Sequence, residues 1–376
     1  MNQNWQIKKL KDICDKGSSN VNMKDLDKLE GDYPIYGASG FIKNVNFYHQ
    51  EKEYIGIIKD GSGIGRTMLL PAKSSVIGTI QYILPKESNS IHFINYALQS
   101  LDLSKYKQGA AIPHIYFRDY GETEIVVPPL EEQKRIVAVL DKKFAQIETL
   151  KTAAEKNLQN AKQLFQAELE KAFSNTSWEK KRLGDCGTFK NGMNFASTES
   201  GYSIHSLGVG DFKNLYKIEN TETLSEISLN AAPSEEYLLK DGDIVFVRSN
   251  GNKELVGRCL LVYPKNIPTT YSGFCIRFRK DFDQLDADFL LHFMKSDKSR
   301  KILNGKEGAN ISNLNQKILG DFEVPLPPLE EQKRIVAHLD SLSEKVHQLE
   351  EIYTKQLADC YELKQAFLQK AFEGEL

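Results

Sequence analysis

A fourteen-residue segment occurs twice in this chain of 376 residues. It reads PPLEEQKRIVAVLD at residues 128–141 and PPLEEQKRIVAHLD at residues 327–340, so the two copies differ at one position. With the same offset of about 199 residues, the stretch 109–130 aligns without gaps on the stretch 308–329. Internal repetition limits the fold more than composition does, because each copy must form the same local structure. The chain is therefore expected to contain two equivalent halves.

The parts between the repeated segments differ from each other. They agree mainly near their starts, where the pattern W-x-x-x-x-L-x-D begins at Trp5 and again at Trp178. A chain of this length is too long for one ordinary core and fits two domains. The sequence predicts a first head at 1–127, a first repeated helical spacer at 128–175, a second head at 176–326 and a second repeated helical spacer at 327–376.

Apolar residues recur in each spacer at steps of three and four, which is the pattern of an amphipathic helix or coiled coil. After its opening prolines, neither spacer contains a glycine or proline before Gly374, so each is predicted to form one long helix. The stripe comprises Ile136, Leu140, Ile147, Leu150 and Leu158 in the first spacer and Ile335, Leu339, Val346, Leu349 and Leu357 in the second.

The repeated segment itself is predicted to start each helix. Its double proline ends the preceding strand, because proline has no N–H to donate, and the second proline suits the first helical turn. Glu131 and Glu132 then lie at the positive end of the helix dipole, and Glu131 is expected to face Arg135 one turn later. The same letters contain the E-x-K of a metal nuclease. The structural interpretation is favoured, because metal-binding carboxylates there need a strand position beside a pocket.

Chain connectivity predicts how the two helices run. A compact head of about 150 residues spans far less than a helix of roughly forty residues. The second head joins the end of the first helix to the start of the second, so the helices must be antiparallel. The expected fold is α+β, with two globular mixed α/β heads separated by a pair of long antiparallel amphipathic helices, in a pseudo-two-fold dumbbell. Within the heads, strands are expected at 53–59 and 242–248, and one late helix at 91–101 and at 287–303.

Few patterns of catalytic chemistry occur in the sequence. GSGIG at 61–65 has its third glycine one residue too early for a dinucleotide-binding loop, so a tight hairpin turn is predicted there. No G-x-x-x-x-G-K-[ST] phosphate loop occurs, and the flanks of Pro-Pro lack the residues of an amino-methyltransferase. The seven histidines form no H-x-x-x-H pair. Neither a catalytic residue nor a metal site is predicted.

Cysteine usage and charge narrow the class of protein further. The five cysteines are widely spaced without a C-x-x-C pair, which argues against a zinc site or a disulfide framework and favours a reducing cytoplasm. No apolar run is long enough to span a bilayer. The net charge of -2 weighs against non-specific coating of DNA but is compatible with a few local contacts.

Polar loops beside glycines are the candidate binding elements of the heads. KDGSGIGR at 59–66 and RSNGNKELVGR at 248–258 each follow a predicted strand, and the stretches 106–114 and 305–317 stand at equivalent places in the repeat. Arginine suits hydrogen bonding to guanine and asparagine to adenine, whereas ordinary solvated loops are the alternative interpretation. The candidate DNA-binding residues are Lys59, Ser62, Arg66, Lys107, Gln108, His114, Arg248, Asn250, Asn252, Lys253, Arg258, Asn310 and Asn313.

The order of head, PPLEEQKRIV helix, different head and second PPLEEQKRIV helix resembles the specificity (S, HsdS) subunit of type I restriction–modification systems. YPIYGASGFI at 33–42 and DGDIVFVRSNG at 241–251 add to the resemblance. It implies that each head is a target recognition domain that reads one half of a bipartite, asymmetric DNA sequence. It also implies that the spacer helices set the distance between the half-sites and, through the residues of their apolar stripe, bind two modification (methyltransferase) subunits.

The resemblance also places the chemistry outside this chain. S-adenosylmethionine belongs to the modification subunits, and ATP and Mg²⁺ to two restriction (translocase and nuclease) subunits, in a cytoplasmic complex of antiviral defence. The chain itself is expected to have no cofactor and no catalytic residue. Two alternatives stay open from the residues alone: a coiled-coil scaffold whose heads bind protein, and a nuclease with an unrecognised pocket.

Overall fold

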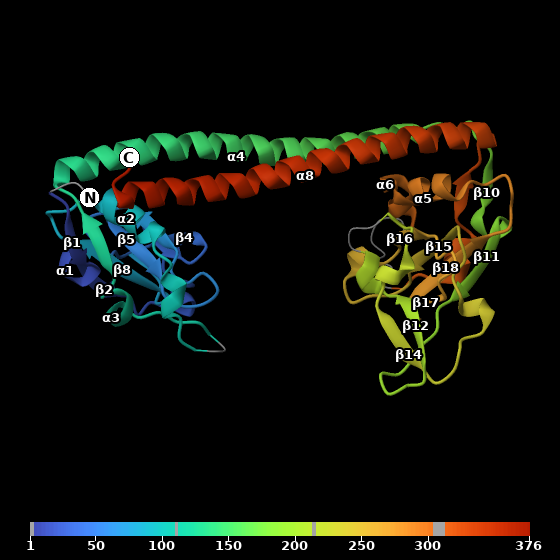
Figure 1. Ribbon diagram of the computed structural model, residues 1–376, viewed down its shortest axis with the longest axis horizontal. Coiled ribbons are helices and arrows are strands. Elements are labelled where there is room, and N and C mark those ends of the chain that lie inside the picture. Colours follow the sequence, from blue (N-terminus) through green and yellow to red (C-terminus); the bar gives the residue numbers. More distant parts are fainter. Residues whose placement is uncertain (1–3, 110–111, 213–215, 304–312) are drawn as a thin grey trace. The chain divides into compact units, whose positions relative to one another are not determined.

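A computed structural model of the chain describes residues 4–109, 112–212, 216–303 and 313–376 (Figure 1). The chain divides into two compact units. Unit 1 comprises residues 1–156 and 353–376, and unit 2 comprises residues 157–352. Among the described helices, none has the length and apolar character that crossing a membrane requires.

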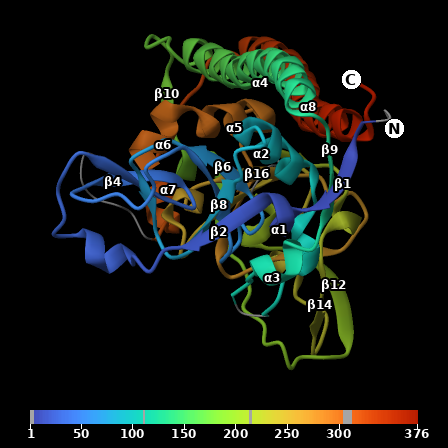
Figure 2. The ribbon, with the colours of Figure 1, turned by 90° about the vertical axis from the view of Figure 1, so that its left-hand side faces the viewer.

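Unit 1 is a mixed α/β head with two long helical segments. Its four-stranded sheet has the order β2-β8-β5-β6, and a three-stranded sheet has the order β4-β3-β7. Strand β1 pairs with β9, and both are labelled in Figure 2. Its elements are β1 (Gln6–Lys9), α1 (Leu10–Ile13), β2 (Cys14–Ser18), β3 (Tyr33–Gly37), β4 (Gly40–Val45), β5 (Tyr54–Ile58), β6 (Thr67–Leu70), β7 (Ser75–Val76), β8 (Ile80–Pro85), α2 (Ile91–Ser100), α3 (Phe117–Tyr120), β9 (Glu124–Val127) and the first part of α4 (Leu130–Ala172).

Strand β5 explains why unit 1 has a core on each face of its main sheet. All five of its residues are buried. Because successive side chains of a strand point to opposite faces, Ile55 and Ile57 pack in the cluster that includes α2, whereas Tyr54 and Ile58 pack in a cluster on the other face. The strand predicted at 53–59 and the helix predicted at 91–101 are both confirmed.

Unit 2 repeats this topology with other residues and adds a fifth strand, β13, beside β16 at the edge of the main sheet. Its main sheet has the order β11-β18-β15-β16-β13, its three-stranded sheet the order β14-β12-β17, and β10 pairs with β19. Its elements are β10 (Lys180–Arg182), β11 (Gly187–Asn191), β12 (Tyr202–Leu207), β13 (Lys217–Ile218), β14 (Glu226–Leu229), β15 (Asp243–Val247), β16 (Cys259–Val262), β17 (Thr269–Tyr271), β18 (Cys275–Lys280), α5 (Ala287–Lys295), α6 (Asp297–Leu303), α7 (Gln316–Gly320), β19 (Glu323–Pro325) and much of α8 (Leu329–Glu373).

The long helices α4 and α8 contribute to both units and are antiparallel in each. In unit 1, the Lys143 ammonium lies 5.5 Å from the centre of the Phe367 ring. In unit 2, Lys162 pairs with Glu350 at 3.9 Å, and His338 pairs with Glu168 at 3.4 Å. As the residue number on α4 rises from 143 to 168, the number of the contacting residue on α8 falls from 367 to 338. This confirms the predicted antiparallel pair.

Two local predictions need correction. The helix predicted at 287–303 is two helices, because Ser296 has an extended backbone (ψ 149°) and its hydroxyl accepts the backbone N–H of Ser299 at 3.2 Å to cap α6. The predicted pairing of Glu131 with Arg135 is also wrong. Arg135 donates to Glu132, three residues before it, at 2.8 Å from both Nε and Nη2, because that spacing allows a two-pronged contact.

Candidate nucleic-acid interface

The loop between β5 and β6 is a hairpin turn closed at its base. Ile58 N–H donates to the Arg66 carbonyl at 3.0 Å, and Gly65 N–H donates to the Ile58 carbonyl at 2.9 Å. Gly65 has a φ of 82°, in the left-handed region where glycine is favoured. The predicted turn at 61–65 is therefore confirmed, and it projects Lys59 to Arg66 from the end of the sheet.

A second loop of unit 1 lies against this turn. Gly61 N–H donates to the Pro113 carbonyl and Ile115 N–H donates to the Lys59 carbonyl, both at 2.9 Å. Gln108 and His114 exchange two backbone hydrogen bonds, and the His114 ring contacts the Asp60 carboxylate. The structure thus brings Lys59, Gln108 and His114 together, although they are up to fifty-five residues apart in the chain.

Unit 2 builds the same backbone frame at the end of β15. Val247 N–H donates to the Arg258 carbonyl and Gly257 N–H donates to the Val247 carbonyl, both at 2.9 Å, and Gly257 has a φ of 77°. Leu314 N–H donates to the Arg248 carbonyl at 2.8 Å, and Ser249 forms a bridge with Asn313. Each of these bonds has its counterpart in unit 1.

The matched bonds identify equivalent residues in the two heads. Lys59 corresponds to Arg248, since each follows the central strand and accepts a hydrogen bond from the second loop. Arg66 corresponds to Arg258, since each closes the base of the turn. The loop of unit 2 is about three residues longer and carries different side chains between these points. The two heads therefore share one backbone frame but present different side chains on it.

The two arginines are held against their own loops. Arg66 is exposed, and its Nε donates to the Gly63 carbonyl at 3.4 Å while Nη2 donates to the Ala38 carbonyl at 3.4 Å. Nε of Arg258 donates to the Glu254 carbonyl at 3.3 Å. A guanidinium has five donors in a planar fork, so the two bonds of Arg66 leave that side chain able to donate to a ligand as well.

Two asparagines of unit 2 shape the longer loop with their side-chain oxygens. Oδ1 of Asn250 accepts the N–H of Asn252 at 2.8 Å, and Oδ1 of Asn252 accepts the N–H of Glu254 at 3.0 Å. These are turns that asparagine forms readily. Each asparagine can therefore offer its amide nitrogen to a ligand, together with the second lone pair of its oxygen.

The remaining candidates lie at the rims of these loops. Ser62, Lys107 and Lys253 are exposed, as is Asn313. Asn310 lies outside the residues that the structure describes. All six candidates of unit 1 thus lie on its two joined loops. These loops, at 59–66 and 106–114 in unit 1 and at 248–258 and 313–317 in unit 2, are called the loop platform of each head.

The apolar stripe of the spacers lies largely inside the protein. Ile136 and Leu140 belong to the core of unit 1, and Ile335, Leu339 and Val346 to the core of unit 2. Ile147 is buried too, whereas Leu158, Leu349 and Leu357 are half-buried and Leu150 is 59% exposed. Buried side chains cannot contact another subunit unless the core opens. The expectation that this stripe faces a partner is revised accordingly, and exposed positions such as Leu150 are better suited to that role.

Sequence reasoning missed the glutamine of the repeated segment. Gln133 and Gln332 are almost fully buried. Gln133 accepts the N–H of Ser90 at 2.8 Å and donates to the Pro128 carbonyl at 2.9 Å. Gln332 accepts the N–H of Asp286 at 2.8 Å and donates to the Pro327 carbonyl at 2.8 Å. Each glutamine therefore joins the start of a long helix to the start of the late helix of its own head. Its exact repetition in both copies of the segment was the sequence signal that could have identified it.

The aspartate that ends the repeated segment makes a second link to the late helix. Tyr96 of α2 donates to Asp141 in unit 1. In unit 2, the Asp340 carboxylate lies 2.7 Å from Nε2 of His292 and 3.1 Å from the Lys217 ammonium. The hydrogen bond to His292, followed by the contact with Lys217, lowers the pKa of Asp340. Figure 1 shows α5 between the sheet of unit 2 and α8, the helix that carries Asp340.

A hollow of about 510 Å³ lies on the loop platform of unit 2. It is lined by Val209, Ser249, Asn250, Gly251, Ser272, Phe274 and Asn313. Four of these residues, Ser249, Asn250, Gly251 and Asn313, belong to the loops already described, and Phe274 comes from the connection between β17 and β18. The hollow therefore combines amide and hydroxyl groups with an exposed aromatic ring.

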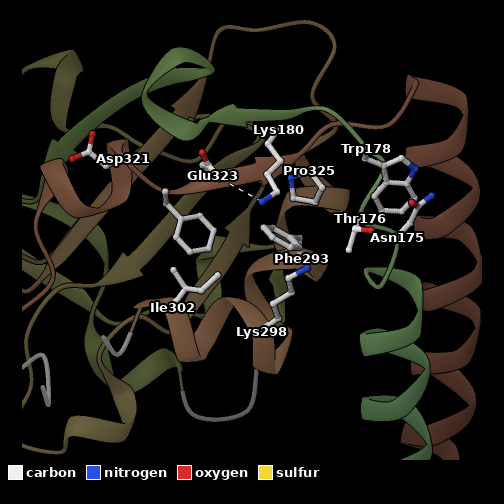
Figure 3. A pocket seen from close by; sticks show the side chains of 11 residues that line it. Asn175, Thr176, Trp178, Lys180, Phe293, Lys298, Ile302, Asp321, Glu323 and Pro325 are labelled. Carbon is white, nitrogen blue, oxygen red and sulfur yellow. Dashed lines mark hydrogen bonds and ion pairs between the residues drawn. The ribbon is translucent and has the colours of Figure 1, made fainter. Parts of the chain in front are cut away.

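Another hollow of unit 2, of about 360 Å³, is shown in Figure 3. It lies beside the β10–β19 pair and α6, with Trp178, Phe293 and Ile302 among its lining residues. Lys180 in its wall pairs with Glu323 at 3.5 Å. None of the candidate DNA-binding residues in the described part of the chain lines it, so it is separate from the loop platform.

The chain matches the type I restriction modification DNA specificity domain over residues 2–159 and 175–357. These stretches include most of both heads and both helices. The chain belongs to this family.

Specificity subunits are also among its curated relatives. It is 29% identical to the StySPI specificity subunit of Salmonella potsdam and 28% identical to the EcoKI specificity subunit of Escherichia coli strain K12, over 76% of this chain in each case. The match spans 64% of the length of each of these two relatives. The MjaVIII specificity subunit of Methanocaldococcus jannaschii is 24% identical over the whole of this chain and 93% of its own.

Solved structures share the fold of this family member. A chain from a study of complex assembly and conformational transition of the type I R-M system has a TM-score of 0.76 and 20% identity, over 100% of this chain and 99% of its own. The HsdS subunit from Thermoanaerobacter tengcongensis has a TM-score of 0.54 and 19% identity, over 100% and 98%. The predicted fold class of mixed α/β heads with long helices is confirmed.

Proposed function

We propose that this chain recognises a bipartite DNA sequence, with one half-site read by each head, as the specificity subunit of a type I restriction–modification complex. The observation that supports this most is the matched loop frame. Both heads hold two loops together with corresponding backbone hydrogen bonds but fill them with different side chains. A repeated frame with unlike side chains suits the reading of two unlike half-sites on one type of polymer.

The chemistry of the loops supports DNA as the ligand. Arg66, Arg248 and Arg258 can donate to guanine or to phosphate, and the amide nitrogens of Asn250 and Asn252 can donate to acceptors on base edges. A specific protein–DNA complex also needs phosphate contacts, which supply much of its affinity. With a net charge of -2, this chain is expected to share those contacts with partner subunits.

The helices are proposed to hold the spacing and to bind the partners. Gln133 and Gln332 join each helix rigidly to a head, so a change in a helix is transmitted to that head. Exposed apolar side chains on α4 and α8 are candidates for contact with two modification subunits, which in turn bind two restriction subunits. These side chains are Leu150, Leu164, Ile352, Tyr361 and Leu363. Methyl transfer and cleavage would then take place in those partners, and this chain would contribute no catalytic residue.

Exchange of one head tests the proposal. Residues 1–127 are replaced by the corresponding head of another specificity subunit, and genomic methylation is mapped in cells that express the partner subunits. One half of the methylated motif should change while the other half and the spacing persist. An unchanged motif would contradict DNA reading by this head and would favour a scaffold whose heads bind protein.

A further inference from the structure

The connection between β17 and β18 adds a third loop to the platform of unit 2. Arg248 N–H donates to the Phe274 carbonyl at 2.8 Å. In unit 1, Lys59 N–H donates to the Thr79 carbonyl at 3.0 Å, and a glycine precedes the acceptor in both cases. Because Lys59 corresponds to Arg248, Phe274 corresponds to Thr79. The two heads therefore differ at this position by an aromatic ring against a small hydroxyl side chain.

The backbone that carries Phe274 is held on both sides. Gly273 N–H donates to the Met193 carbonyl at 2.8 Å, and Cys275 N–H donates to the Ser272 carbonyl at 2.9 Å. The Cys275 side chain that follows is buried in the core. The Phe274 side chain is nevertheless 59% exposed. A fixed backbone thus presents an apolar ring to solvent at the edge of the loop platform.

The surroundings of the ring suit the edge of a base. Phe274 and Val209 are the apolar members of the hollow, and Ser249, Asn250 and Asn313 are among its hydrogen-bonding members. In the major groove, thymine alone presents a methyl group, beside acceptors and donors of its base pair. Aromatic carbon packs favourably on that methyl group, while hydroxyl and amide groups can bond the polar atoms next to it.

We propose that Phe274 contacts the C5-methyl group of a thymine in the half-site read by the second head, and so helps to determine its specificity. The inference rests on the proposed function, since it assumes that this head reads DNA. The first head has Thr79, and so no aromatic ring, at this position. A ring that acted as a wedge between base pairs would not depend on the methyl group, so the two modes are distinguishable.

Binding to uracil-substituted DNA tests the contact. The chain is assembled with its modification subunits and bound to duplexes in which each thymine of the second half-site is replaced, one at a time, by uracil, which lacks only the methyl group. For one thymine, the wild-type complex should bind the uracil duplex about threefold to fivefold more weakly. Phe274→Ala should bind both duplexes equally, and Phe274→Leu should keep part of the difference.

Phe41→Ala is the matched control. Phe41 is an exposed phenylalanine of the first head, 60% exposed, and its removal should leave the thymine preference in the second half-site unchanged. If no uracil substitution weakens wild-type binding, or if Phe274→Ala retains the preference, the proposed contact is wrong even though the second head reads DNA. If exchange of residues 176–326 leaves the methylated motif unchanged, DNA reading by this head is itself wrong, and the contact is wrong with it.

Discussion

A buried glutamine in each repeated segment satisfies several backbone groups that helix starts leave without partners. Gln332 bonds the Asp286 N–H, the Gln284 carbonyl and the Pro327 carbonyl, all at 2.8 Å. The first turn of a helix exposes N–H groups, and the proline before it places a carbonyl in an apolar setting. One amide side chain can bond both kinds of group, since its nitrogen donates hydrogen bonds and its oxygen accepts them.

Replacement of this glutamine is predicted to destabilise unit 2. Gln332→Leu keeps the volume roughly constant but leaves a buried N–H and two carbonyls unpaired, each costing about 1–3 kcal/mol. We expect the free energy of unfolding to fall by roughly 3 kcal/mol, measured by urea denaturation. Gln348→Leu is the control, since Gln348 is exposed on the same helix and its amide donates to Glu344 one turn away. Equal stability of the two variants would show that Gln332 is not a link between helix and head.

Asp340 is predicted to make stability depend on pH. Its pKa is lowered in the folded state by His292 and then Lys217, so its contribution is present above the unfolded pKa of about 3.9 and is lost as pH falls through the folded value. Because the side chain is 42% exposed, we expect Asp340→Asn to cost only about 1 kcal/mol at pH 7. Urea denaturation at pH 7 and at pH 3.5 should show the difference from wild type shrinking at the lower pH.

An exposed aspartate provides the comparison for this pH effect. Asp283 lies in the same unit and is exposed. Asp283→Asn should leave the free energy of unfolding unchanged at both pH values. A loss at pH 7 that is as large at pH 3.5 would mean that Asp340 acts through packing or a neutral hydrogen bond rather than through its charge.

At the scale of elements, local patterns predicted what local physics decides. The strand at β5 follows from a short apolar run and the hairpin at 61–65 from glycine spacing, and both are present. The break at Ser296 escaped prediction, because the apolar pattern continues through it and only the capping of α6 by the Ser296 hydroxyl ends α5. Contacts between residues far apart in the chain were harder to predict from the sequence. The sequence indicated two loops per head, but the bonds that join Lys59 to Ile115 and Arg248 to Leu314 depend on the tertiary fold.

The spacing of the apolar stripe likewise did not reveal what the stripe contacts. Periodicity identified Ile136 and Ile335 as one face of a helix, and that face exists. It could not tell whether the face covers the chain's own head or another subunit, since either burial gives the same spacing. The answer lay in Gln133 and Gln332, whose buried hydrogen bonds require that the repeated segment itself face the head.

At the scale of the whole molecule, the residues that attach the helices to the heads are distinct from the residues of the loop platforms. The residues that recur unchanged, such as the glutamine and aspartate of the repeated segment, attach a long helix to the late helix of a head in both units, although the aspartate has a different partner in each. The residues that differ occupy the loop platforms. If the loops read DNA as proposed, substitutions there can alter the bases read without disturbing the attachment of helix to head.

Helix length is predicted to set the number of unread base pairs between the half-sites. Seven residues inserted into α4 after Lys156 and seven into α8 after Ile352 add two turns, which keeps the helix faces nearly in register. At 1.5 Å per residue the insertion adds about 10 Å, or about three base pairs at 3.4 Å each. Methylation mapping should find the same bases in each half with a longer spacing. Seven residues inserted between the exposed Ala231 and Ala232 should leave the spacing as it was. A change in the bases read, with an unchanged spacing, would show that the helices do not measure the distance.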